Sequence, residues 1–166
     1  SAPPIRNRSG KDIFYEESMR IPMIISWPEK IQPRKDEHLM IAFADLYPSL
    51  LSVMGFRKEI PGTVQTFDLS REILGESRRE VIQPYYFVQF DNHAIGYRGL
   101  RTATHTFVVH AQNGIIDETV LFDRTKDPYQ INNIAEHSPK LVRQFREQLK
   151  KWLHHTHDSF ANYLTP

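Results

Sequence analysis

The sequence has 166 residues, of which 40% are hydrophobic and 25% are charged, and this is the composition of one ordinary globular domain. A net charge of +1 favours neither nucleic acid nor a membrane as a partner, and no apolar run approaches the roughly 18 residues of a membrane span. The absence of cysteine excludes disulfides, a thiolate metal site and a cysteine nucleophile.

The first predicted strand follows a polar segment. Residues 1–10 show no periodicity and are expected to be exposed, leading into a charged turn at Lys11. The apolar run Met23–Trp27 lies between Pro22 and Pro28, and a short apolar run between prolines predicts a strand buried on both faces. The charged residues just ahead of it are then expected on the rim of a sheet.

A helix is predicted after the next polar connection. Asp45 is a suitable N-cap, Pro48 is tolerated in a first turn, and Gly55 suits the left-handed position that follows a helix. The spacings of three and four predict one apolar face, made of Leu46, Leu50, Val53 and Met54.

The composition changes at the charge cluster 76–80, which predicts one region over residues 1–80 and a second over 81–166. The second region contains β-branched and aromatic runs separated by turn signals such as Asn113-Gly114. Connections this short predict an antiparallel meander, since parallel neighbours need long crossovers. Its four strands are expected at Tyr85–Phe90, Tyr97–Thr102, Thr106–His110 and Thr119–Phe122.

The C-terminal part predicts a turn and then a helix. An Asp127-Pro128 turn follows the last strand, with Asn133 placed to cap the next turn. Ser138 and Pro139 then form a helix start, and the apolar stripe behind them is expected to pack on the meander. That stripe contains Leu141, Phe145, Leu149, Trp152 and Leu153.

Two segments carry a resemblance to a known family. Residues 10–28 fit G-K-x-x-x-Y-E-E-x-x-R-x-P-x-I-x-x-W-P, and residues 121–135 fit L-[YF]-D-x-x-x-D-P-x-x-x-x-N-[LI]-A. These patterns resemble those of the sulfatases, members of the alkaline-phosphatase-like superfamily. The resemblance implies an α/β fold of that type, seen in its C-terminal part: a strand and helices of the main sheet, then a small antiparallel β-sheet packed by a C-terminal helix.

The sequence also lacks several motifs that the family carries. It has no [CS]-x-P-x-R motif for the nucleophile, no Asp-Asp dipeptide and no T-S-D-H-G stretch. The resemblance covers about Gly10 to Trp152 and only the family's C-terminal third. It therefore implies the C-terminal portion of a sulfuric ester hydrolase, inactive alone and binding no cofactor itself. The partner would be the N-terminal part of the same sulfatase, with its calcium and formylglycine nucleophile; a homo-oligomer stays open, as do the periplasm, secretion or the lysosome as compartments.

The resemblance makes Lys11 the catalytic and substrate-binding residue, since the family's lysine at this position contacts the sulfate group. Weaker candidates on the substrate side are Asn92, His93 and Arg98. For Arg98 and for Arg101 the structural alternative is a strand arginine paired with a carboxylate. The histidines at 154, 155 and 157 suit a helix C-terminus, and no metal site is expected there.

Two other functions stay open. The chain could be a non-catalytic carbohydrate- or protein-binding module of the same fold, with Tyr85, Tyr86 and Phe90 as an aromatic platform. It could also belong to a related phosphatase or phosphonate hydrolase, because the nucleophile that separates these enzymes is absent. The residues do not identify which sulfate ester is the substrate.

Overall fold

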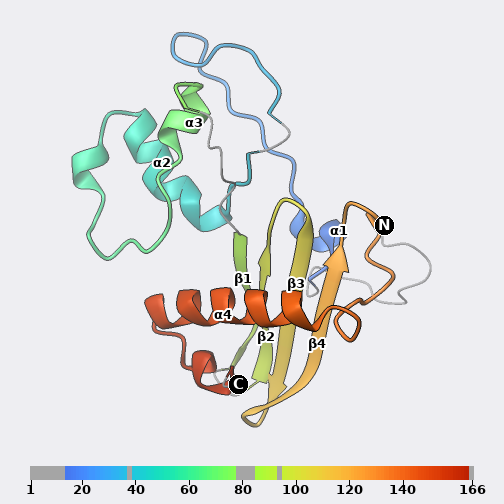
Figure 1. The fold of residues 1–166 in the computed structure, drawn as a ribbon. Coiled ribbons are helices and arrows are strands. Elements are labelled where there is room, and N and C mark those ends of the chain that lie inside the picture. The colour runs from blue at the N-terminus through green and yellow to red at the C-terminus, as the bar shows by residue number, and fades with distance from the viewer. Residues whose placement is uncertain (1–13, 37–38, 78–84, 93–94, 165–166) are drawn as a thin grey trace. The chain divides into compact units, whose positions relative to one another are not determined.

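The computed structural model describes residues 14–36, 39–77, 85–92 and 95–164, with the backbone alone for residues 85–92 and 95. The described residues form two compact units (Figure 1). One contains the residues up to Pro22 together with those from Tyr86 onward, and the other is Met23–Tyr85. The boundary predicted at residue 80 lies outside the described residues and stays a prediction. Among the described residues, no helix has both the length and the apolar character to cross a bilayer.

The first unit is built on the predicted meander. Its strands lie in chain order, and β2 pairs with β3 and β3 with β4 in antiparallel fashion. The turn between β3 and β4 places Asn113 at φ 53° and Gly114 at φ 80°. Two left-handed residues are what a tight hairpin between right-twisted strands requires. The strands are β1 (Tyr85–Asn92), β2 (Ile95–Arg101), β3 (His105–Gln112) and β4 (Ile115–Asp123).

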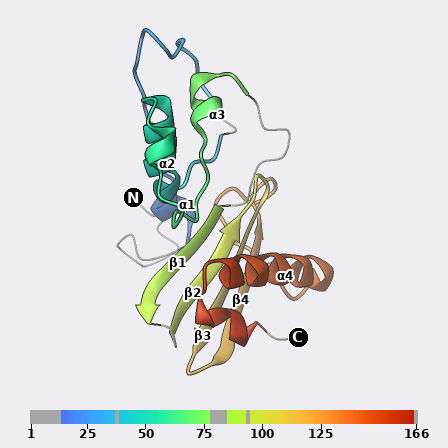
Figure 2. The ribbon, with the colours of Figure 1, turned by 90° about the vertical axis from the view of Figure 1, so that its left-hand side faces the viewer.

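Helix α4 (Pro139–His155) covers one face of this sheet, as predicted (Figure 2). Phe145, Leu149 and Leu153 of its apolar stripe are buried, and the short helix η3 (Ser159–Tyr163) extends the same layer. The strand residues in this core are Leu100, Phe107, Val109, Ala111 and Leu121. We call this side of the sheet the α4 face.

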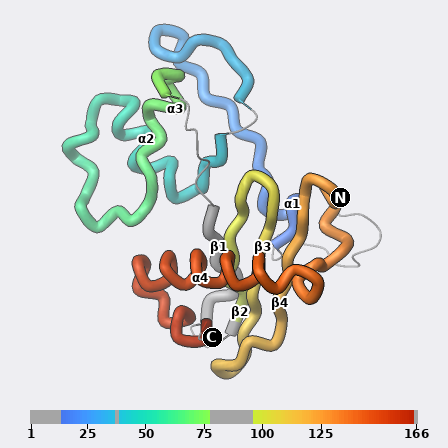
Figure 3. Tube along the Cα trace, viewed as in Figure 1, coloured from blue at the N-terminus to red at the C-terminus, as the bar shows by residue number. Residues whose placement is uncertain are grey.

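The opposite face of the sheet carries a second, smaller core. Because side chains alternate along a strand, Val108, Val120 and Phe122 point away from α4. Phe14 packs on them, just before the short helix α1 (Glu16–Met19). The tube in Figure 3 shows this N-terminal segment beside the chain that follows β4. The sheet therefore lies between α4 on one face and the segment from Phe14 to Met19 on the other.

The described residues of the Met23–Tyr85 unit contain four short helices joined by irregular segments, and the main helix was predicted correctly. Gly55, at φ 92°, follows that helix as expected. Asp45 precedes it, but the carboxylate accepts hydrogen bonds from the backbone N–H groups of Ala42 and Phe67 instead of capping the helix. The elements are η1 (Phe43–Asp45), α2 (Leu46–Val53), η2 (Arg57–Glu59) and α3 (Ser70–Leu74).

The predicted apolar face of α2 is only partly correct. Val53 is buried, but Leu50 and Met54 are exposed, and Ser49 is fully buried instead. Ser49 can be buried because its hydroxyl donates to the Asp45 carbonyl and accepts from the Leu69 backbone N–H. Hydrogen bonding thus determines which side of this helix packs inward.

The buried strand predicted at Met23–Trp27 is wrong for this structure. These residues form neither helix nor strand, and Ile24 is 94% exposed. A strand needs a neighbour for its backbone hydrogen bonds, and the described part of the chain provides none for this run. The side chains of Met23 and Ile24 are therefore exposed.

Candidate functional site

The predicted site residues are described to different extents. Lys11 and His93 lie outside the described residues, and Asn92 is described only as a backbone position in β1. The site can nevertheless be built from the described residues of the first motif, which start at Phe14, and the first charged one of these is Glu16.

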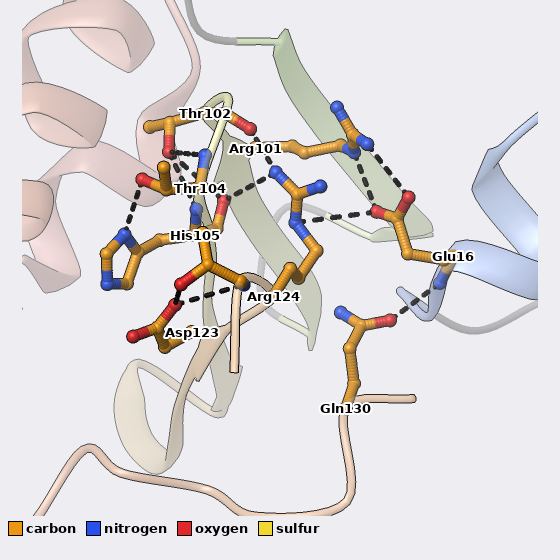
Figure 4. Close-up of polar contacts among 9 residues, drawn as sticks. Glu16, Arg101, Thr102, Thr104, His105, Asp123, Arg124 and Gln130 are labelled. Carbon is orange, nitrogen blue, oxygen red and sulfur yellow. Dashed lines mark hydrogen bonds and ion pairs between the residues drawn. The ribbon is translucent and has the colours of Figure 1, made fainter. Parts of the chain in front are cut away.

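Glu16 is held by an arginine from the sheet (Figure 4). Arg101, at the end of β2, donates from Nε to Oε1 at 2.6 Å and from Nη2 to Oε2 at 2.8 Å. Two parallel bonds between a guanidinium and a carboxylate fix both the distance and the relative orientation of the two groups. The first motif is thereby fastened to the meander.

The second motif contributes two further contacts to the same segment. Nε of Arg124 lies 3.7 Å from Oε1 of Glu16, and its guanidinium also donates to the backbone carbonyls of Thr102 and His105. The side-chain carbonyl of Gln130 accepts the backbone N–H of Glu16 at 2.7 Å. The two family-like motifs, far apart in sequence, thus meet at Glu16.

The charges around Glu16 shift its pKa. Burial alone would raise that pKa, but the hydrogen bonds and charge of Arg101, together with the charges of Arg124 and Arg20, outweigh burial and hold it below the ordinary value of 4.5. Burial and the neighbouring Arg101 lower the pKa of Arg124, an effect that Glu16 opposes. Glu16 is therefore ionised in the folded protein at neutral pH.

The lowered pKa of Glu16 predicts an acid-dependent stability. Because the folded-state pKa lies below the unfolded one, the stabilisation is complete above about pH 4.5 and is lost as the pH falls through the folded-state pKa. We expect Glu16→Gln to lower the free energy of unfolding by roughly 2 kcal/mol near neutral pH, the scale of hydrogen bonds to a charged group. Thermal unfolding of both proteins across the acid range measures this difference.

A suitable control for the acid titration is Glu147→Gln, because Glu147 is exposed on α4. This variant should unfold like the parent protein at every pH. If the difference between Glu16→Gln and the parent stayed constant from neutral to strongly acid pH, ionisation of Glu16 would not be its source.

Arg98 lies on the α4 face, the side of the sheet opposite to Phe14 and Glu16. Its side chain is 3% exposed, and Nε donates to Oδ2 of Asp158 at 2.7 Å. The guanidinium also lies 4.8 Å from the ring centre of Phe160. This environment fits the structural alternative for Arg98, while contact with a substrate stays a prediction.

The second motif also has the structural role expected of it. The carboxylate of Asp127 accepts the backbone N–H groups of Ile131 and Asn132, both at 2.7 Å. The side-chain carbonyl of Asn133 accepts from the backbone N–H groups of Leu121 and Ala135, so Asn133 ties this loop to β4. These bonds shape the loop that presents Gln130.

The sequence alone predicts no role for Glu16, Arg124 or Gln130, and it suggests for Arg101 only a strand arginine paired with a carboxylate. One signal was available, because Glu16 stands inside the first motif and Arg124 inside the second. Among the described residues, no group of three histidine or acidic side chains could hold a metal ion.

Comparisons with known proteins identify the family of this chain. A family model described as N-sulphoglucosamine sulphohydrolase, C-terminal, matches residues 9–158. The chain belongs to this sulfatase family. The match includes both motifs that meet at Glu16.

Individual relatives of this sulfatase domain cover the same region. Endo-4-O-sulfatase of Bacteroides thetaiotaomicron is 28% identical over 160 residues, covering 87% of this chain and 31% of the relative. N-acetylglucosamine-6-O-sulfatase of the same organism is 28% identical over 152 residues, covering 85% of this chain and 26% of the relative. The chain thus spans about a third of the length of the relatives it matches, or less.

Solved structures support the fold of this sulfatase domain. The crystal structure of yidJ from Bacteroides fragilis, a candidate sulfatase, is 64% identical with a TM-score of 0.85, covering 93% of this chain and 33% of that one. A structure from work on glycosaminoglycan metabolism by Bacteroides thetaiotaomicron is 26% identical with a TM-score of 0.70, covering 80% of this chain and 30% of that one. The architecture is therefore the C-terminal part of an alkaline-phosphatase-like fold.

Proposed function

We propose that this chain is the C-terminal portion of a sulfuric ester hydrolase whose substrates are sulfated carbohydrates. The observation that carries the proposal is the family match over residues 9–158, which spans both motifs. The carbohydrate class comes from relatives named for 4-O- and 6-O-sulfate esters. Lys11 is the proposed sulfate ligand, and Asn92 and His93 are weaker candidates on the substrate side.

Lys11 suits this role chemically. An ammonium group is a compact charge with three donors that can meet a sulfate oxygen from several directions. In a preformed site it would also stabilise the negative charge that develops on the leaving oxygen. The nucleophile, expected to be formylglycine, and the calcium ion are proposed for the remainder of the protein, because this sequence contains no motif for either.

The proposed partner is that remainder, the N-terminal part of the same sulfatase. The Met23–Tyr85 unit exposes apolar side chains over several elements, and such surfaces usually mark a contact with another part of a protein. The same remainder would supply the neighbours that the apolar run Met23–Trp27 lacks here. The exposed residues are Met23, Ile24, Phe43, Tyr47, Leu50, Met54 and Phe56.

The experiment measures sulfate released by the intact protein from 4-nitrophenyl sulfate, N-acetylglucosamine 6-sulfate and N-acetylgalactosamine 6-sulfate. We expect hydrolysis of at least one sugar sulfate by the intact protein and none by residues 1–166 alone. Turnover of 4-nitrophenyl phosphate in place of every sulfate ester would favour the related phosphatase. Binding of the sugars without any turnover would favour the non-catalytic module.

A further inference from the structure

The loop that follows β4 is built inside out. Gln130 is 2% exposed, while its neighbours Tyr129 and Ile131 are 63% and 52% exposed. The usual distribution is the reverse, because burial of apolar surface is favourable, whereas a buried amide needs hydrogen-bond partners. Nε2 of Gln130 has no such partner within the part of the chain that the structure describes. The loop thus buries an amide and leaves two large, mainly apolar side chains outside.

The outward position of these two side chains is fixed by the backbone of the loop. The carboxylate of Asp127 accepts the N–H groups of Ile131 and Asn132, both at 2.7 Å. Gln130 has a φ of 54°, and its side-chain carbonyl accepts the N–H of Glu16 (Figure 4). A surface that is held in one conformation loses less conformational entropy when a partner covers it. The loop is therefore suited to a permanent contact.

Arg20 adds positive charge beside this loop. It is exposed, and its backbone N–H donates to the carbonyl of Glu16 at 2.8 Å, while Glu16 in turn is bonded to Gln130. Three guanidinium groups, those of Arg20, Arg101 and Arg124, act on the single carboxylate of Glu16. Arg101 already binds that carboxylate through two hydrogen bonds. Arg20 can therefore bind a further carboxylate.

We propose that Arg20, Tyr129 and Ile131 form a docking surface for the N-terminal remainder of the protein, which covers the two apolar side chains and supplies a carboxylate to Arg20. We call these three residues the Tyr129 surface. The occupant follows from length, because the chain spans about a third of its relatives or less, and most of such a protein lies outside these residues. Tyrosine and arginine are also among the residue types that contribute most of the binding energy at protein interfaces. This inference rests on the proposed function, from which it takes the existence of the remainder.

The proposal gives the unit built on the meander its own contact with the remainder. The apolar side chains named above belong to Met23–Tyr85, whereas the Tyr129 surface belongs to the other unit. Apolar contacts are not directional, but a pair between a guanidinium and a carboxylate fixes the orientation of the two groups. The Tyr129 surface would therefore determine how the meander is oriented on the remainder.

Thiol labelling of the intact protein tests whether the Tyr129 surface is covered. Tyr129→Cys and Ile131→Cys introduce thiols that are easily identified, because these 166 residues contain no cysteine. The matched control is Glu147→Cys, since Glu147 is exposed on α4. We expect maleimide to modify both surface thiols about 10²-fold more slowly than the control, because a covered thiol reacts only when the contact opens. Mass spectrometry of the peptides gives the rates, and modification of either surface thiol at the control rate would overturn the proposal.

A carbodiimide identifies what covers the surface. This reagent joins an amine to a carboxylate in contact with it, forming an amide while the carbodiimide takes up the water as a urea. Arg20→Lys places an amine at this position, and the exposed Lys58 is the internal control for unspecific linking. We expect residue 20 of this variant to be linked to an aspartate or glutamate outside these 166 residues. A link to Glu16 or Glu17 alone, or a link between two copies of the chain, overturns the proposal.

Neither measurement depends on turnover, so the two proposals can fail separately. Slow labelling and the expected link in an intact protein that hydrolyses no sulfate ester would leave the docking surface standing and reject the enzymatic function. Hydrolysis of a sugar sulfate by a protein whose Tyr129→Cys thiol reacts at the control rate would reject the docking surface alone.

Discussion

Lys11→Ala in the intact protein is expected to lower kcat for sulfate-ester hydrolysis by about 10²-fold or more, the loss seen when one preorganised charge-stabilising donor is removed from an active site. Stability should hardly change, because the sequence predicts Lys11 on the rim of a sheet, and substitutions at the surface usually alter the free energy of unfolding by less than about 0.5 kcal/mol. Steady-state kinetics on a sulfated sugar and thermal unfolding of the same samples measure both effects.

The matched control for Lys11→Ala is Lys58→Ala, which removes an exposed lysine in η2. It should leave kcat, KM and the melting temperature at the parent values. Turnover by Lys11→Ala at nearly the parent rate would show that the sulfate contact implied by the family does not apply to this residue.

Arg98→Ala is expected to have the largest effect on stability, a loss of about 3 kcal/mol in the free energy of unfolding, because breaking a buried pair leaves one charge without compensation. The carboxylate left behind is that of Asp158, whose side chain is 14% exposed and can be partly hydrated. The substitution also removes the contact between the guanidinium and the ring of Phe160. Denaturant unfolding measures the loss.

Kinetics separate the two roles considered for Arg98. A structural arginine lowers the melting temperature and leaves KM unchanged at a temperature where the variant is folded. Replacing both partners, as Arg98→Met with Asp158→Leu, should recover part of the lost stability, since no unpaired charge stays buried. A raised KM in folded Arg98→Ala would instead support the substrate-side role.

The sequence was most informative where one local pattern determines the structure. The Ser138-Pro139 start and the stripe through Phe145 and Leu149 predicted α4, because a helix face repeats within a few residues. Asn113-Gly114 predicted a hairpin turn, because the left-handed conformation restricts the residue types that fit. In both cases the cause and the effect lie in neighbouring residues.

The candidate site was less predictable because it depends on pairing over long distances. Glu16 could have paired with any of many arginines, and nothing local in the sequence selects Arg101 or Arg124. The prediction for Met23–Trp27 failed for a related reason: hydrophobicity shows that a segment can be buried, but burial requires neighbours. Ser49 illustrates a third limit, because its buried position depends on hydrogen bonds to Asp45 and Leu69 that periodicity does not report.

The distance along the chain from Glu16 to its partners also determines the order of events during biosynthesis. Arg101 lies 85 residues after Glu16, and Gln130 lies 114 residues after Glu16. At roughly 5 to 20 residues per second, the ribosome adds Arg101 about 4 to 17 s after Glu16. During this interval the segment that begins at Phe14 has no sheet on which to dock. Docking of this segment therefore waits until β2 and the loop that contains Gln130 have been synthesised.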